Sequence, residues 1–236
     1  AIVLAGTCSF SARHYFLPHK YLVGAKYDQV MVGPKKLDAF AYLAAHWEEF
    51  DAFHGSPVCK GYSIMNNLPW LKSREYPAHI LPLREAFSAI GKPYVIENVM
   101  GARYGAQGLA KRGLAAHGMQ AGWLCGSMFG LPIYRHRLFE SSFFWLAPAH
   151  PKHRHRIRAG RSLEGRARDI VFHEAKHGIN GWSEGKGIGP AAGWRQAAAA
   201  MEVGWMDSAG TSQAIPPRFT EFIGAHLLAA AQARRN

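Results

Sequence analysis

The chain has 236 residues, 48% of them hydrophobic, and a formal net charge of +12. This length and apolar content suit one folded domain with a small additional region, and they exclude a chain that is disordered throughout. No apolar run reaches the roughly 18 residues of a membrane span, and residues 1–4 lack the pattern of a signal peptide. We therefore expect a cytoplasmic protein with no membrane partner.

The first predicted elements are a strand, a helix and a second strand. Apolar residues 1–4 predict a buried strand, residues 11–17 a helix and residues 21–25 the second strand. This order predicts a βαβ unit, which binds a nucleotide-like cofactor at the carboxyl ends of its strands. Asp38 then precedes a helical run at 41–49, where an Asp is typical of a helix N-cap.

Three later strands are predicted to end near reactive side chains. The stretches run from residue 50 to the turn at 55–57, over 94–99 and over 133–140. Cys59 follows the first, Glu97 lies in the second, and Arg135 and Arg137 lie in the third. Open α/β sheets bind their ligands at such strand ends, so we expect these four side chains to form one site.

The remaining elements complete an α/β fold. We predict a long loop over 64–82, a helix over 83–90, a strand over 123–125 in which Cys125 is a core residue, and helices over 195–201 and 220–234. The predicted fold is a doubly wound α/β sheet. Its domains are a catalytic core (1–140), a small basic recognition region (141–195) and a C-terminal segment that returns to the core (196–236).

A basic tract predicts a polyanionic partner. Residues 151–168 contain seven Lys and Arg residues against one acid, Glu164. Such clustering neutralises phosphates, and the resulting binding weakens steeply as salt rises. We predict a polymer of phosphates as the partner, with contacts from Lys60, Lys152, Arg154, Arg156, Arg158 and Arg161. A protein that is merely basic is the alternative.

The histidines and cysteines favour neither a metal site nor a disulfide framework. Five histidines lie in or near the basic tract: His150, His153, His155, His173 and His177. No cysteine lies among them and their spacing matches no common ligand pattern, so we predict no metal site. The three cysteines are far apart in the chain, which favours reduced thiols over a disulfide framework.

The predicted site suits addition chemistry on an electron-poor ring. A thiolate at Cys59 can add to an electron-poor carbon, and the carboxyl of Glu97 can hold or protonate a ring nitrogen. The guanidinium groups of Arg135 and Arg137 can fix that carboxyl, the thiolate or a phosphate. The structural alternatives are a buried thiol, an ion pair and a pair of surface arginines.

The chain resembles the DNA (cytosine-5)-methyltransferases, especially the short phage-borne kind, in five motifs that occur in the family's order. The motifs are Ser56-Pro57-Val58-Cys59, Glu97-Asn98-Val99, Cys125-Gly126-Ser127-Met128-Phe129-Gly130-Leu131, Arg135-His136-Arg137 and residues 214–224. The resemblance implies a Rossmann-like methyltransferase domain, monomeric, in a bacterial or phage-infected cell. It also implies double-stranded DNA as the partner, a flipped cytosine, a covalent bond from Cys59 to C6, and a methyl group from S-adenosylmethionine.

The cofactor half departs from the family's pattern. The family's glycine-rich loop corresponds to Ala5-Gly6-Thr7-Cys8-Ser9-Phe10, which keeps one glycine, and its ribose-binding acid corresponds to Lys26. An ammonium group cannot accept hydrogen bonds from ribose hydroxyls. The resemblance places Gly6, Thr7, Lys26, Asp38 and Pro57 at the cofactor, with Asp38 either contacting adenine or capping its helix. Val58 also replaces the second proline before the cysteine.

Three functions follow from this mixture. The first, which we expect, is an S-adenosylmethionine-dependent cytosine C5-methyltransferase. The second is the same pyrimidine chemistry with another carbon donor, whose additional carboxylate or phosphate Lys26 would bind. The third is a DNA-binding relative without activity, which predicts loss of Cys59, Glu97 and the arginines; the sequence retains them all.

Overall fold

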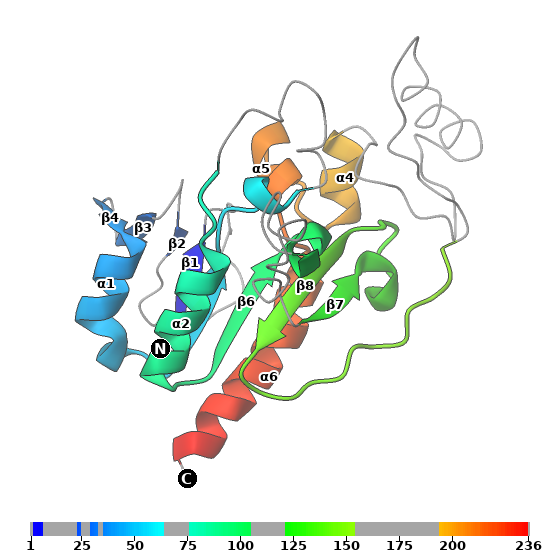
Figure 1. Ribbon diagram of the computed structural model, residues 1–236. Helices are drawn as coiled ribbons and strands as arrows, with labels where there is room; N and C mark the ends of the chain where they lie inside the picture. Colours follow the sequence, from blue (N-terminus) through cyan, green and yellow to red (C-terminus); the bar gives the residue numbers. More distant parts are fainter. Residues whose placement is uncertain are drawn as a thin grey trace, which may run out of the picture. The chain divides into compact units, whose positions relative to one another are not determined.

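The computed structural model describes residues 2–6, 23–24, 29–32, 35–63, 76–104, 121–153 and 194–235 (Figure 1). The chain forms two compact units. The first consists of Ala1–Trp123, Arg137–Leu146 and Glu221–Asn236, and the second of Leu124–His136 and Ala147–Thr220. These bounds differ from the predicted domains, because a stretch of the expected core, 124–136, joins the unit that contains 147–153 and 194–220.

The main sheet is mixed. Its strands are β1 (Ile2–Gly6), β5 (Ala52–Ser56), β6 (Tyr94–Asn98), β8 (His136–Ser141) and β7 (Gly122–Cys125), in the order β1-β5-β6-β8-β7. β5 pairs in parallel with β1 and β6, whereas β8 runs antiparallel to β6. Every residue of β5 and β6 is buried, so these central strands do not show the alternation of apolar and polar residues that a half-exposed strand shows. The predicted α/β class is confirmed at this level.

A second, smaller sheet replaces the predicted second strand of the βαβ unit. β2 (Val23–Gly24), β3 (Gln29–Val32) and β4 (Lys35–Asp38) pair antiparallel in sequence order. Only four residues separate β2 from β3, a connection that permits antiparallel pairing but not a parallel crossover, which needs a dozen residues or more. The helix predicted over 11–17 lies outside the described residues.

Most predicted helices are confirmed with shifted ends. They are α1 (Ala39–His46), α2 (Ile80–Ile90), α4 (Trp194–Ala200) and α6 (Pro217–Arg235), with short 3-10 helices at Trp47–Glu49, Lys60–Tyr62, Met100–Tyr104 and Gly126–Phe129. α2 begins earlier than predicted, because Pro82 occupies its first turn, where a missing N–H has no helical acceptor to lose. α5 (Ser208–Gln213) lacks an apolar period and was not predicted; Asp207 caps it by accepting from Gly210 N at 2.6 Å.

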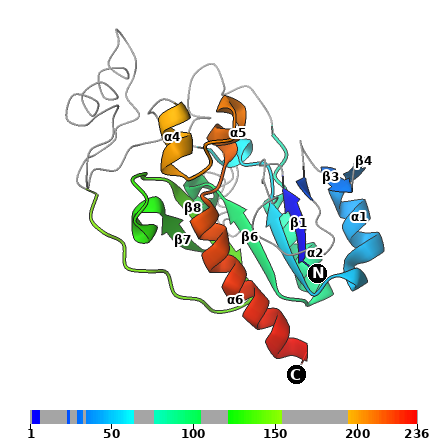
Figure 2. The ribbon, with the colours of Figure 1, turned by 180° about the vertical axis from the view of Figure 1, so that it is seen from behind.

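α2 packs closely on β5 in the first unit. A Cβ on Gly55 would lie 2.4 Å from Leu83 Cδ2 and 3.3 Å from the Phe87 ring, so the glycine permits the close approach of helix and strand. Phe87 also stacks on Phe53 with ring centroids 5.3 Å apart. Figures 1 and 2 show α2 on one face of the sheet and α6 on the other.

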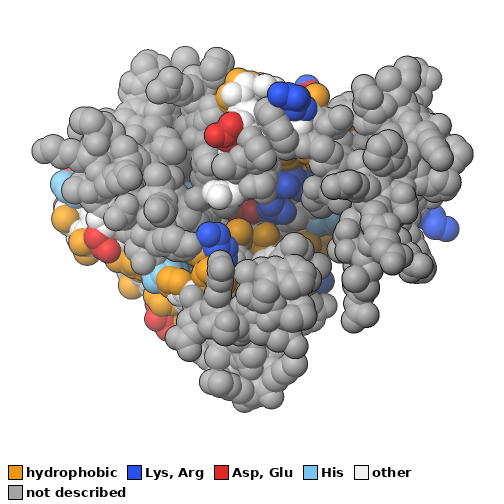
Figure 3. All heavy atoms as spheres, turned by 90° about the horizontal axis from the view of Figure 1, so that it is seen from above, with side chains coloured by type: hydrophobic (Ala, Val, Ile, Leu, Met, Phe, Trp, Pro, Cys, Tyr) orange, Lys and Arg blue, Asp and Glu red, His pale blue; other side chains and the backbone are white. Residues whose placement is uncertain are grey.

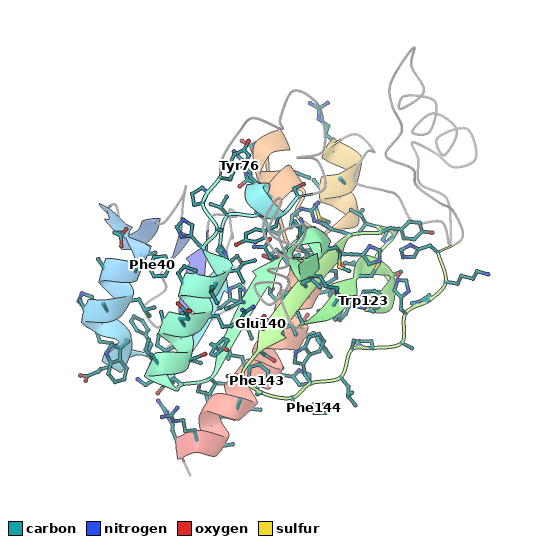
Figure 4. The ribbon with its side chains drawn as sticks, viewed as in Figure 1. Phe40, Tyr76, Trp123, Glu140, Phe143 and Phe144 are labelled. Carbon is teal, nitrogen blue, oxygen red and sulfur yellow. The ribbon has the colours of Figure 1, made fainter. Side chains whose placement is uncertain are left out.

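Ion pairs and hydrogen bonds add to this packing. Arg84 of α2 donates from Nε and Nη2 to the Glu140 carboxylate of β8, at 2.5 and 2.7 Å. Figure 4 shows Glu140 on its strand. Arg235 near the end of α6 pairs with Asp51 at 2.6 Å. Helix α6 is thereby attached to the start of β5.

The second unit has its own apolar core. It is formed by Leu131, Ile133, Ala197, Ala198, Ala200, Met201, Val203 and Ala214. A Cβ on Gly126 would lie 2.3 Å from the Ile133 carbonyl oxygen, so a glycine is needed there. Among the described residues, no helix has the length and apolar character to cross a membrane.

Candidate active site

Cys59 lies just beyond the carboxyl end of β5. Its side chain is half-buried, and its backbone (φ −86°, ψ −10°) begins the short helix Lys60–Tyr62. Tyr62 N donates to the Cys59 carbonyl at 3.0 Å. The Tyr62 hydroxyl accepts from Ile80 N at 3.2 Å, so the cysteine loop is held against the first residue of α2.

Glu97 lies in the adjacent parallel strand, β6. It is 2% exposed, and its Oε1 lies 3.1 Å from Nε of Arg137 in β8. A buried carboxylate costs several kcal/mol unless a cation or donors compensate it. Arg137 supplies that compensation, and the pair fixes the direction of the Glu97 side chain.

Asn98 joins the Glu97 strand to the cysteine loop. Its Nδ2 donates to the Pro57 carbonyl at 2.9 Å, and its Oδ1 accepts from Val99 N at 2.9 Å. Both bonds use a side chain that is 1% exposed. Asn98 belongs to the predicted motif Glu97-Asn98-Val99, but no role was predicted for it; its position directly after Glu97 was the available signal. The structure thus brings Cys59, Glu97 and Arg137 onto neighbouring, connected elements.

Arg135 is placed differently from Arg137. It is 5% exposed and belongs to the second unit. Arg137 belongs to the first unit, together with Glu97. The two arginines are therefore not equivalent, although they lie two residues apart in the chain.

The predicted cofactor residues are only partly within the described chain. Gly6 ends β1 opposite Ser56 in the parallel register, so it lies at the same strand edge as Pro57. Asp38 ends β4 and caps α1, its Oδ1 accepting from Ala41 N at 2.7 Å; this is the capping alternative of the sequence analysis. Thr7 and Lys26 lie outside the described residues.

The predicted DNA contacts are likewise described in part. Lys60 is exposed, with Nζ 6.0 Å from the centre of the Tyr76 ring, and Lys152 is exposed. Figure 3 shows Lys and Arg side chains on the face seen from above. Arg154, Arg156, Arg158 and Arg161 lie outside the described residues.

His54 is a buried histidine in the middle of β5. Burial lowers the pKa of its imidazole from 6.5 to about 4, because the charged ring would lose its hydration. It is therefore neutral at pH 7. We assign it a structural role in β5, the strand that precedes Cys59.

A second cluster of reactive side chains lies in the second unit. Cys125, His136, His150 and His153 each offer one ligand atom, and these four atoms lie within 4.8 Å of one another. The prediction of no metal site considered only histidines close together in sequence. Cys125 is the last residue of β7 and His136 is the first residue of β8. Both are far in sequence from His150 and His153, so spacing along the chain did not indicate that the four would meet.

No model of a known protein family matches the chain, and a search of curated proteins found no match. A functional assignment therefore depends on the motifs and on the geometry. The geometry offers a half-buried thiol just after the carboxyl end of β5, and a buried carboxylate–guanidinium pair that joins the next strands, β6 and β8. That combination suits nucleophilic addition with a positioned acid.

Proposed function

We propose that the protein modifies C5 of cytosine in DNA through a covalent bond between Cys59 Sγ and C6 of a flipped base. The observation that carries this proposal is the buried Glu97–Arg137 pair, at 3.1 Å, on a strand that Asn98 connects to the cysteine loop. A nucleophile and an oriented carboxyl group on adjacent strand ends are what addition to a pyrimidine requires.

The proposed steps begin with Cys59. Its thiolate adds to C6, and the C5–C6 electron pair moves to give an enamine. Glu97 hydrogen-bonds to N3 and the exocyclic amine and so stabilises the charge that develops in the ring. C5 then attacks an electrophilic carbon of the donor, and the donor's leaving group departs with the electron pair of the broken bond; with S-adenosylmethionine this group would be a neutral thioether. Loss of the C5 proton to a base and of the Cys59 thiolate from C6 restores the aromatic ring.

Arg137 is proposed to position Glu97. Its Nε lies 3.1 Å from Glu97 Oε1, and this ion pair would hold the carboxylate in the direction from which it hydrogen-bonds to the base. The target carbon is inaccessible within a duplex, so the base must leave the stack. The exposed Lys60 next to Cys59, and the basic tract, are proposed to hold the DNA backbone.

S-adenosylmethionine is the proposed donor, and the chain fits it in part. The parallel strands β1, β5 and β6 support a Rossmann-like domain, in which Gly6 at the end of β1 would lie against the donor. Lys26 fits less well, since it cannot accept from ribose hydroxyls. Its charge favours the second candidate, a donor with an additional carboxylate or phosphate.

A donor-independent trap tests the addition step. Duplexes of random sequence in which 2-pyrimidinone replaces cytosine present a more electrophilic C6 to a thiolate. We expect a covalent protein–DNA species that survives denaturation and maps by mass spectrometry to Cys59. Cys59→Ser should abolish it. An adduct that persists in Cys59→Ser, or none with the wild-type protein, would overturn the proposal.

Two buried carboxylates provide a matched comparison for Glu97. Glu140 is also buried and also paired with an arginine, Arg84. Glu97→Gln should slow adduct formation about 100-fold, the usual size of a positioned acid's contribution. Glu140→Gln should lower stability but leave the adduct rate of the folded protein unchanged. Equal rates for the two variants would remove Glu97 from the mechanism.

The donor is tested separately. S-adenosylmethionine is titrated into the protein by calorimetry, with and without duplex DNA, and micromolar binding is the expected result. Without binding, the nucleosides of DNA treated with protein and cell extract are analysed by mass spectrometry for another C5 substituent. A substituent that is missing with Cys59→Ser would identify the second candidate.

A further inference from the structure

Four potential metal ligands from separate parts of the chain meet in the second unit. Cys125 is the last residue of β7, His136 is the first residue of β8, and His150 and His153 lie in the segment after β8. Cys125 is fully buried and the three histidines are half-buried. None of these side chains is needed for the addition chemistry proposed for Cys59.

The distances among the ligand atoms are close to those around a tetrahedral ion. Cys125 Sγ lies 3.3 Å from His153 Nε2, and His150 Nε2 lies 3.0 Å from His153 Nε2. Zinc ligands in a tetrahedron are separated by about 3.3 Å for two nitrogens and about 3.6 Å for nitrogen and sulfur, given the usual bond lengths. The four atoms span at most 4.8 Å, so small side-chain rotations would complete the geometry.

The chemistry of these groups also suits a cation. Neutral imidazole is the form in which histidine binds a metal ion. An ion bound by Cys125 would replace its thiol proton and compensate the buried thiolate.

Neighbouring side chains orient the ligands. Ser127 Oγ donates to Cys125 Sγ at 3.2 Å, and the Tyr134 ring stacks on His153 with centroids 3.8 Å apart. Hydrogen bonds and packing of this kind fix ligand direction in metal sites and affect affinity.

We propose that Cys125, His136, His150 and His153 bind one Zn²⁺ ion in a closed, tetrahedral, structural site. Sulfur and imidazole ligands favour zinc over magnesium or calcium. Four protein ligands leave no position for a substrate, which distinguishes a structural from a catalytic ion.

The site would attach an irregular segment to the sheet. Residues 147–153 form neither helix nor strand, so zinc binding would supply order that backbone hydrogen-bond ladders do not. His153 is followed in sequence by Arg154, the first arginine of the basic tract. The ion would thus hold His153, the residue directly before the first arginine of this tract.

Metal content of the purified full chain tests the site. The protein is loaded with zinc and dialysed, and its metal content is measured by inductively coupled plasma mass spectrometry. We expect one zinc ion per wild-type chain, and less than a tenth of that in His150→Asn and His153→Asn. His46→Asn, which changes a histidine with 39% of its side chain exposed, is the matched control and should keep the zinc. A wild-type chain without zinc, or a His150→Asn chain with full zinc, would overturn the proposal.

Substitution of cobalt for zinc identifies which cysteine is the thiolate ligand. It also tests the metal site independently of the addition chemistry proposed for Cys59. The cobalt-loaded protein should show a sulfur-to-cobalt charge-transfer band in wild type and in Cys59→Ser, but not in Cys125→Ser. A band lost in Cys59→Ser and kept in Cys125→Ser would assign the metal elsewhere. Cys59→Ser should retain zinc while losing the DNA adduct, so failure of either proposal is recognised independently.

Two measurements guard against variants that simply unfold. Ser127→Ala keeps all four ligands and should weaken zinc binding about 10-fold in competition with a chelating dye, the usual size of such effects. Chelation should lower the melting temperature of the wild-type protein but not that of His150→Asn. An equal effect of the chelator on both would contradict a structural zinc at this cluster.

Discussion

Acidification is expected to destabilise the protein through His54. This residue lies in the middle of β5 and is 7% exposed, and burial holds the pKa of its ring at about 4 against an ordinary 6.5. Unfolding restores the ordinary pKa, so the unfolded chain binds more protons between these two values. The contribution of neutral His54 to stability is therefore complete above pH 6.5 and is lost as the pH falls towards 4.

The magnitude follows from the two pKa values. The full difference between 6.5 and 4 corresponds to about 3 kcal/mol, since each pH unit is worth about 1.4 kcal/mol. Between pH 7 and pH 5 the same linkage gives a loss of about 2 kcal/mol. Such a loss is a large part of the stability of an average domain.

Urea unfolding at pH 7 and pH 5 measures this loss. The comparison variant, His54→Asn, keeps a polar side chain that does not titrate. Wild type should lose about 2 kcal/mol more than the variant, because titrations at distant sites affect both proteins equally. Equal losses, or a ring pKa near 6.5 when His54 is followed by NMR, would refute the reasoning.

Three further predictions concern local structure. Gly55→Ala places a methyl group 2.4 Å from Leu83 Cδ2 and should cost about 1–3 kcal/mol in denaturant unfolding; no change would mean that α2 moves freely on β5. Asn98→Ala removes the hydrogen bond to the Pro57 carbonyl; it should lower the free energy of unfolding by about 1–3 kcal/mol and slow adduct formation at Cys59. An unchanged adduct rate would show that this hydrogen bond does not position the cysteine loop. Asp38→Ala removes the N-cap of α1 and should lower the free energy of unfolding by about 1 kcal/mol. An unchanged unfolding midpoint would exclude a capping role. Calorimetry with S-adenosylmethionine would show whether Asp38 also binds the donor.

The candidate site was largely accessible from the sequence. Cys59 and Glu97 occur in or just after apolar runs, and buried parallel strands produce such runs irrespective of what packs on them. The role of Asn98 was not accessible, because its hydrogen bond to Pro57 joins residues 41 positions apart. The small antiparallel sheet was also missed, since a two-residue strand has too few side chains to show a period.

The sequence by itself determined which segments form the central strands and helices, because apolar periodicity, prolines and caps act over a few residues. The tertiary structure alone decided that Arg137 pairs with Glu97 and that Cys125 lies with the histidines. Arg135 and Arg137 look alike along the chain, yet they belong to different units, and Arg137 lies 3.1 Å from the Glu97 carboxylate. Cys125 and His153 are 28 residues apart but 3.3 Å from each other, a proximity that arises from strand order and the course of the following segment, which no local pattern encodes.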